Sequence, residues 1–318
     1  MSDHMVTVDL ITGFLGAGKT TFIHRYLRYL KEQGLSVRMI ENEFGDVSID
    51  SHLLEEEDCE IEDLAGMCMC CVGKDAFIRV LLESTQTGCD RIIVEPSGIY
   101  DVDEFFEVMS LPQVAATCQI GSILTIADPM GMDYLTEEAS YLLFAQLLAS
   151  GMVIMSKTQL LSQEQLEDSI SKLNQLMKDR GCPAGLLSDL CTKSWDQLDA
   201  EDYEEFMEIG YARFVHDREI FNHSEAFQSL AILGHCYAQE DLAERIRRLY
   251  DSPSCGRVYR IKGFLTSEQG VSYEVNCTTD THVIRPAQGQ EDILVVIGQM
   301  LHDREIKEIF SLRYPIGR

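Results

Sequence analysis

The sequence has no long apolar run and little positive charge. No stretch approaches the roughly 18 consecutive apolar residues of a membrane-spanning helix, and no basic segment heads a secretion signal. Lys and Arg number 26 against 53 Asp and Glu, which gives a formal net charge of −27. A surface this acidic repels the phosphates of nucleic acids and of anionic membranes. We therefore expect a cytoplasmic protein that binds neither.

Regularly spaced cysteines and histidines are also missing. The 11 cysteines are irregularly placed and odd in number, which favours a reducing compartment over a disulfide framework. His235, His282 and His302 have no metal-site spacing around them, so we expect structural roles for them. At 318 residues the chain exceeds the roughly 250–300 residues at which single cores stop growing. This length predicts two domains.

Near the N-terminus the sequence carries a phosphate-binding motif. Residues 13–21 read GFLGAGKTT, which fits G-x-x-x-x-G-K-[ST], between an apolar run and a segment with helical spacing. Gly13, Gly16 and Gly18 allow backbone N–H groups to turn inward around an anion, and the helix N-terminus adds its dipole. Lys19 would reach the outer phosphates and the Thr20 hydroxyl would ligate Mg²⁺. The motif predicts a nucleotide.

Several later apolar runs end in polar residues. Residues 91–94 end at Glu95, followed by Pro-Ser-Gly98; residues 122–127 end at Asp128; residues 152–155 end at Ser156 and Lys157. Burying a carboxylate at the end of a strand costs free energy, so such a residue is expected to have a function. Beside a phosphate loop, Glu95 would orient the Mg²⁺ shell or the attacking water. The alternative is that Glu95 only caps local structure.

Apolar runs that alternate with helical patterns predict an α/β fold. Such runs form mostly parallel strands with helices on both faces, and ligands bind at the carboxyl ends of the strands. One such helix is expected over residues 163–178, with Ser162 as N-cap and Gln165 completing a capping box. We expect a P-loop NTPase domain over residues 1–190, an acidic helix and linker over 191–218, and a smaller α+β domain over 219–318.

Cys68, Cys70 and Cys71 form a cluster between two glycines. Thiolates favour soft or borderline ions such as Zn²⁺ and Co²⁺, and three of them leave a tetrahedral site incomplete and labile. A redox role is one alternative, and cysteines that act as small buried hydrophobes are another. The nearby loop 41–46 holds three carboxylates and is either a γ-phosphate sensor or an acidic surface turn.

Taken together, these motifs resemble the CobW-like P-loop GTPases, relatives of the UreG and HypB metal-insertion GTPases. The resemblance rests on GFLGAGKTT, NEFGD at 42–46, CMCC at 68–71, VEPSG at 94–98 and RVYRIKG in the C-terminal part, and covers nearly the whole chain. It implies a slow GTPase of the cytoplasm that uses Mg²⁺ and loads Zn²⁺ or Co²⁺ into a client metalloprotein, with the oligomeric state open and a homodimer as one alternative.

The resemblance also implies a role for each matching residue. The phosphate loop, with Ala17 and Thr21, would bind GTP and Mg²⁺; Glu43 or Asp46 would act in the first switch; Glu95 with Gly98 would act in the second. Lys19 and Glu95 would serve catalysis, Ser156 and Lys157 would lie at the base, and the metal would be held by Cys68, Cys70 and Cys71.

The base-reading loop departs from the family pattern. The usual N-K-x-D or T-K-x-D is here Ser156-Lys157-Thr158-Gln159. A neutral Gln159 carbonyl replaces the carboxylate that accepts two hydrogen bonds from guanine, at a cost of about 1–3 kcal/mol. Two further readings therefore stay open: a P-loop ATPase or small-molecule kinase, and a non-hydrolysing scaffold that activates a metalloenzyme.

Overall fold

The protein forms two compact units, Met1–Ile220 and Phe221–Arg318, in a computed structural model. The structure describes residues 5–41, 60–63, 73–182, 189–212, 226–233, 237–267, 269–287 and 292–311. Among these residues no helix is long and apolar enough to cross a membrane.

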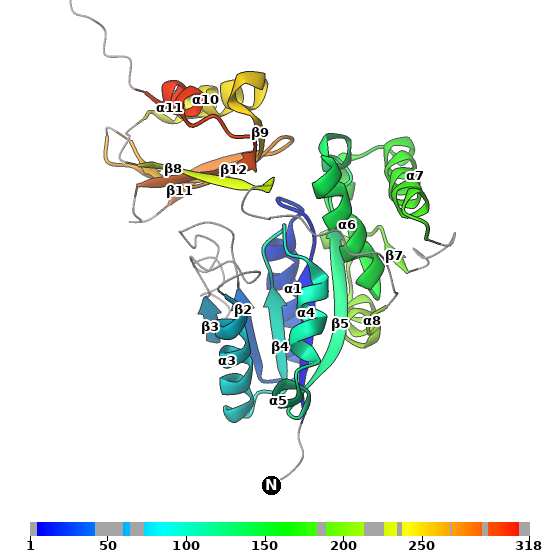
Figure 1. The fold of residues 1–318 in the computed structure, drawn as a ribbon. Helices are drawn as coiled ribbons and strands as arrows, with labels where there is room; N and C mark the ends of the chain where they lie inside the picture. Colours follow the sequence, from blue (N-terminus) through cyan, green and yellow to red (C-terminus); the bar gives the residue numbers. More distant parts are fainter. Residues whose placement is uncertain are drawn as a thin grey trace, which may run out of the picture. The chain divides into compact units, whose positions relative to one another are not determined.

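The first unit is built on a seven-stranded parallel sheet with the strand order β3-β2-β4-β1-β5-β6-β7 (Figure 1). The strands are β1 (Val6–Thr12), β2 (Val37–Glu41), β3 (Glu60–Asp63), β4 (Arg91–Glu95), β5 (Cys118–Ala127), β6 (Met152–Met155) and β7 (Leu190–Cys191). The central strands are buried on both faces, which explains their nearly continuous apolar sequences. The α/β prediction is confirmed.

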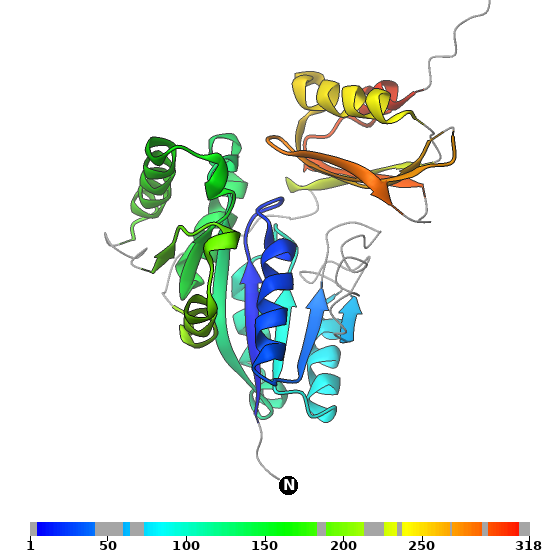
Figure 2. The same cartoon turned by 180° about the vertical axis from the view of Figure 1, so that it is seen from behind.

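Helices cover both faces of this sheet (Figures 1 and 2). They are α1 (Lys19–Glu32), α3 (Gly73–Gln86), α4 (Val102–Met109), α5 (Pro112–Ala115), α6 (Glu137–Ala149), α7 (Gln163–Asp179) and α8 (Ala200–Glu208). One core cluster joins the sheet to α3 and α4, and another joins the opposite face to α1 and α8. The capping box of α7 forms as predicted, with the Gln165 N–H donating to Ser162 Oγ at 3.2 Å.

The segment after β7 contains the acidic helix α8, which lies in the first unit. Helix α8 exposes Glu201, Glu204, Glu205 and Glu208 and buries Tyr203 and Phe206. Tyr203 and Phe206 pack against Phe22 of α1, with ring centroids 6.4 and 5.7 Å away. Helix α8 is therefore an aromatic support for α1.

A buried ion pair ties β1 to its neighbours. The Asp9 carboxylate is fully buried and accepts hydrogen bonds from the Arg91 guanidinium of β4, from the Tyr26 hydroxyl of α1 at 2.9 Å and from the Ser122 N–H of β5 at 2.9 Å. A Cβ on Gly121 would lie 2.2 Å from Asp9 Oδ1, so only glycine leaves room for this carboxylate. The network fixes α1, and with it the preceding loop, to the centre of the sheet.

The second unit is an antiparallel sheet with two helices on one face (Figure 1). Its strand order is β11-β10-β9-β12-β8, with β8 (Gln228–Leu233), β9 (Arg257–Thr266), β10 (Ser272–Thr278), β11 (His282–Ala287) and β12 (Ile293–Gln299). Helices α10 (Gln239–Asp251) and α11 (Asp303–Phe310) share one apolar cluster with β8, β9, β10 and β12. The α+β expectation for this part is confirmed.

Candidate functional site

The loop between β1 and α1 has the backbone of an anion cradle. Gly13, Gly16 and Gly18 have φ values of 141°, 75° and 97°, which L side chains rarely adopt. Gly18 is the N-cap of α1 and no side chain caps the helix, so the amides of the first turn are available to a ligand. Ala17 is buried behind the loop, whereas Thr21 is exposed on the first turn of α1.

Lys19 bridges the two ends of this loop. It is the first residue of α1, is only 7% exposed, and its Nζ donates to the Gly13 carbonyl at 3.0 Å. A buried ammonium held across a ring of backbone N–H groups adds positive charge where the motif predicts phosphates.

Thr20 and Glu95, distant in sequence, meet beside the loop. The Thr20 hydroxyl donates to Glu95 Oε1 at 3.0 Å, and Glu95 is 6% exposed at the end of β4. Glu41 ends β2, is also buried, and is the register partner of Glu95. Glu41 was expected as one of the three carboxylates of the loop 41–46, whereas here it is the last residue of β2.

Gly98 lies directly on the phosphate loop. A Cβ at this position would be 2.5 Å from the Leu15 nitrogen and 2.8 Å from the Phe14 carbonyl carbon. Any side chain would collide with backbone, so glycine is required here by close approach. The turn after β4 and the phosphate loop are therefore packed against each other through their main chains.

The segment after β6 lies next to the start of α1. Ser156 is buried, donates through Oγ to the Ala127 carbonyl at 3.3 Å, and has its Cβ 3.8 Å from where a Gly18 Cβ would stand. Lys157 has a left-handed φ of 55° and pairs with Asp128 at the end of β5. Gln159 lies in the short turn Thr158–Leu160 and is exposed.

Trp195 is a neighbour of the loop that the sequence analysis missed. It is the single tryptophan of the chain, and its Cζ2 lies 3.9 Å from where a Gly18 Cβ would stand. Its ring stands 5.7 Å from that of Phe22, and the Arg25 guanidinium donates to its carbonyl at 3.0 Å. A lone aromatic residue within an acidic stretch gave no spacing signal from which this position could be predicted.

The remaining predicted residues, Glu43, Asp46, Cys68, Cys70 and Cys71, lie outside the described residues. Within the described part of the chain, no group of three or more His, Cys, Asp or Glu side chains is placed to hold a metal ion. Cys89, Cys118 and Cys277 are buried, and burial raises the pKa of each thiol. These cysteines behave as the small hydrophobes that the sequence analysis expected.

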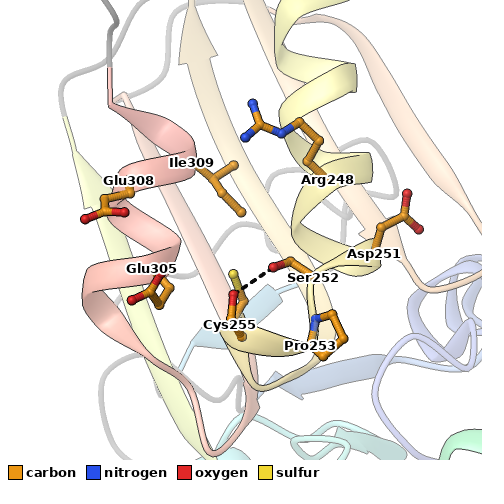
Figure 3. Close-up of a pocket in the computed structure, with 9 residues that line it drawn as sticks. Arg248, Asp251, Ser252, Pro253, Cys255, Glu305, Glu308 and Ile309 are labelled. Atoms are coloured by element: carbon orange, nitrogen blue, oxygen red, sulfur yellow. Dashed lines mark hydrogen bonds between the residues drawn. The ribbon is translucent and has the colours of Figure 1, made fainter.

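The second unit has a cavity of about 420 Å³ (Figure 3). It lies between the end of α10, the turn Pro253–Cys255 and one side of α11, where Arg248 stands among Asp251, Glu305 and Glu308. The Ser252 and Ser254 hydroxyls, which line this cavity, are hydrogen-bonded to each other at 2.9 Å (Figure 3). No motif of the sequence falls here.

Comparison with known proteins identifies a family match over the region that contains the phosphate loop. A model of the CobW/HypB/UreG nucleotide-binding domain matches residues 7–181. The zinc chaperone CobW of Pseudomonas aeruginosa is 27% identical over 208 residues, 61% of this chain and 50% of that protein. The zinc-regulated GTPase metalloprotein activator 1 of Schizosaccharomyces pombe is 31% identical over 197 residues, 58% of this chain and 47% of that protein.

The chain spans about half the length of the curated relatives it matches. Among solved structures, the Zn(II)-bound YjiA GTPase from E. coli aligns over 96% of this chain and 98% of its own, with 18% identity and a TM-score of 0.41. The hydrogenase maturation factor HypB from Archaeoglobus fulgidus aligns over 64% of this chain and 88% of its own, with 14% identity and a TM-score of 0.43.

Proposed function

The chain belongs to the CobW/HypB/UreG family, and from this membership and the geometry at the phosphate loop we propose that it is a nucleotide-dependent metallochaperone. It binds GTP with Mg²⁺, hydrolyses it slowly, and couples the nucleotide to the capture and release of Zn²⁺ or Co²⁺. The ion is cargo for a client metalloprotein. Two of the relatives are named zinc chaperones and one is named a zinc-regulated GTPase metalloprotein activator. These names support this class of function.

The observation that carries the nucleotide half of the proposal is the contact between Thr20 and Glu95. A hydroxyl and a buried carboxylate 3.0 Å apart, beside the phosphate loop, are the hard oxygen donors that Mg²⁺ prefers. The buried Glu41 at the neighbouring strand end places a second carboxyl group next to Glu95, and carboxyl oxygens are ligands of hard cations. When bound, Mg²⁺ would neutralise charge that develops on the phosphoryl oxygens.

The residues of the chain would then divide the work. Loop amides and Lys19 hold the β- and γ-phosphates, Thr20 holds the metal, and Glu95 orients water in its shell. Gly98 brings the main chain of the turn after β4 against the main chain of the loop. Glu43 or Asp46 would complete the first switch. No arginine finger or catalytic glutamine is evident in the sequence, so turnover should be slow.

Cys68, Cys70 and Cys71 would hold the cargo ion. Three thiolates are an incomplete tetrahedral set for Zn²⁺ or Co²⁺, which suits a site that must release its ion. In the sequence, the first-switch residues Glu43 and Asp46 lie between the phosphate loop and these cysteines. Nucleotide and Mg²⁺ would order the switch and bring the thiolates together, and hydrolysis would relax the segment.

The test begins with nucleotide binding and phosphate release. Because Trp195 stands beside Gly18, its emission should change when Mg²⁺ and a non-hydrolysable GTP analogue are added, and the Lys19→Ala variant should abolish this change. Glu95→Gln should keep the binding signal and lower kcat about a hundredfold. If the protein releases no phosphate with any metal or client, only the interpretation as a non-hydrolysing scaffold remains.

One observation favours a second candidate, an ATPase or small-molecule kinase. Gln159 replaces the family's aspartate and is exposed on the turn that follows Lys157, so the guanine-specific pair of hydrogen bonds is incomplete. Comparing the affinities for GTP and ATP by Trp195 fluorescence separates the two. Tighter ATP binding would select the second candidate.

A further inference from the structure

Gln146 is a buried amide among the largely apolar buried residues of helix α6. Helix α6 is buried nearly all round, and its other buried residues are Ala139, Tyr141, Leu142, Leu143, Phe144, Ala145, Leu147, Leu148 and Ala149. The Gln146 side chain is fully buried. A primary amide in this setting is costly unless its polar atoms are used, so its partners indicate what it does.

The amide group holds the turn that follows β4. Gln146 Nε2 donates to the Gly98 carbonyl and to the Tyr100 carbonyl, both at 3.4 Å. The Tyr100 N–H donates back to the Ser97 carbonyl at 2.9 Å and closes the turn. Each bond to Gln146 is long, but both come from one fully buried group and converge on one turn.

The same residue is fixed to the central sheet on its other side. The Thr125 hydroxyl of β5 donates to the backbone carbonyl of Gln146 at 2.9 Å. The backbone of Gln146 is thus bonded to β5, whereas its side chain alone reaches the turn. This turn begins at Glu95, which accepts the hydrogen bond from the Thr20 hydroxyl. It also packs Gly98 against the Leu15 backbone.

We propose that Gln146 is a positioning residue for nucleotide hydrolysis, because it holds the turn that begins at Glu95 and that packs the Gly98 backbone against the phosphate loop. The catalytic part of this inference rests on the proposed function, whereas the hold on the turn does not. Gln146 acts by donation alone: within the described chain its Oε1 accepts no hydrogen bond. A side chain that cannot donate therefore loses the whole effect, and a carboxylate, which faces two carbonyls as an acceptor, repels the turn.

The experiment compares Gln146→Met with Thr125→Val in the full-length protein. Methionine keeps the length and the apolar packing of the side chain but removes the donor. Valine removes the other buried hydrogen bond of the same residue and leaves the turn held. We expect the amides of Ile99 and Tyr100 to exchange hydrogen at least tenfold faster in Gln146→Met and at the wild-type rate in Thr125→Val.

Kinetics then test the catalytic part. Gln146→Met should lower kcat for GTP about tenfold with KM nearly unchanged, Gln146→Glu should lower it further, and Thr125→Val should match the wild type. If the Ile99 and Tyr100 amides of Gln146→Met exchange hydrogen at the wild-type rate, Gln146 does not hold the turn. If they exchange faster but kcat stays at the wild-type value, Gln146 holds the turn but does not position catalytic groups. A wild-type protein that hydrolyses no nucleotide contradicts the proposed function instead, while the exchange experiment still decides whether Gln146 holds the turn.

Discussion

At the scale of single residues, the phosphate site depends on glycines for two different physical reasons. Gly13 combines a φ of 141° with a Cβ position 2.2 Å from the Ile126 carbonyl oxygen, so both backbone conformation and space require glycine. At Gly98 the lack of space alone requires glycine, because the Leu15 and Phe14 backbone lies against it. The motif predicts the first requirement, whereas the second comes from two segments that meet only in the folded chain.

The Gly98→Ala variant should test that contact. We expect it to destabilise the protein by about 1–3 kcal/mol through overpacking against backbone, and to reduce GTP hydrolysis strongly. Gly131→Ala is the matched control, because a Cβ there has no neighbour closer than 3.8 Å and should change the free energy of unfolding by less than about 0.5 kcal/mol. Equal urea midpoints for the two variants would contradict the close approach.

Because the Cys277 thiol is buried, we expect the second unit to lose stability at alkaline pH. Burial raises the pKa of its thiol from 9.0 to about 11, and burial also raises the pKa of Tyr250, whose hydroxyl donates to the Cys277 carbonyl at 2.8 Å. The folded state therefore keeps protons that the unfolded chain loses. The stabilisation is fully present below pH 9 and is lost as the pH rises towards 11, about 2–3 kcal/mol for the thiol alone.

The measurement is urea unfolding between pH 8.5 and 11, followed by pulsed alkylation of Cys255, which is buried in the same unit. The wild type should lose stability across this range, and Cys277→Val should lose less because only the tyrosine still contributes. A variant with the wild-type pH dependence would show that the thiol does not titrate as described.

At the scale of elements, the sequence predicts the central strands, which are apolar, and does not predict the edge strands β3 and β11, which carry polar residues. β1, β4, β5 and β6 are buried on both faces and read as apolar runs. β11 lies at the edge of its sheet, is mostly exposed and contains Pro286, which edge strands tolerate but which argues against a strand in the sequence. β3, with the sequence EIED, is likewise an edge strand, and its three acidic residues give no apolar signal.

Helix α8 shows what charge alone does not predict. Its charge predicts a solvated surface helix, and Glu201, Glu204, Glu205 and Glu208 are exposed. Yet Tyr203 and Phe206, one turn apart, bury their rings against α1, where Tyr203 also stacks on Tyr29 with centroids 5.4 Å apart. Two aromatic residues in a short acidic helix carry enough apolar area to dock it.

Phe206→Ala should therefore weaken the first unit. Phe206 is 1% exposed, and truncating a buried phenylalanine costs about 3–5 kcal/mol. The loss should appear in urea unfolding followed by Trp195 fluorescence, since Trp195 contacts the same Phe22 ring. Glu204→Ala, on the exposed side of α8, should leave the midpoint unchanged. The same midpoint in both variants would mean that α8 does not support α1.

At the scale of the whole molecule, the sequence predicts the chemistry of the site better than its setting. Gly13–Thr21, Glu95 and the segment after β6 meet at one edge of the sheet because the carboxyl ends of parallel strands meet there. Trp195 and Gln146 were not predicted, since each acquires its role through contacts with residues far away in the sequence. The chain divides into its two compact units after Ile220.

The central claim is that nucleotide and metal bind to one coupled switch. The most direct measurement is a Zn²⁺ titration of the reduced protein with and without Mg²⁺ and a non-hydrolysable GTP analogue. Coupling of about 1–3 kcal/mol should tighten Zn²⁺ binding roughly 5- to 150-fold, and Zn²⁺ should tighten the analogue by the same factor. Cys68→Ser/Cys70→Ser should abolish the effect. Equal Zn²⁺ affinity with and without the analogue would contradict the account.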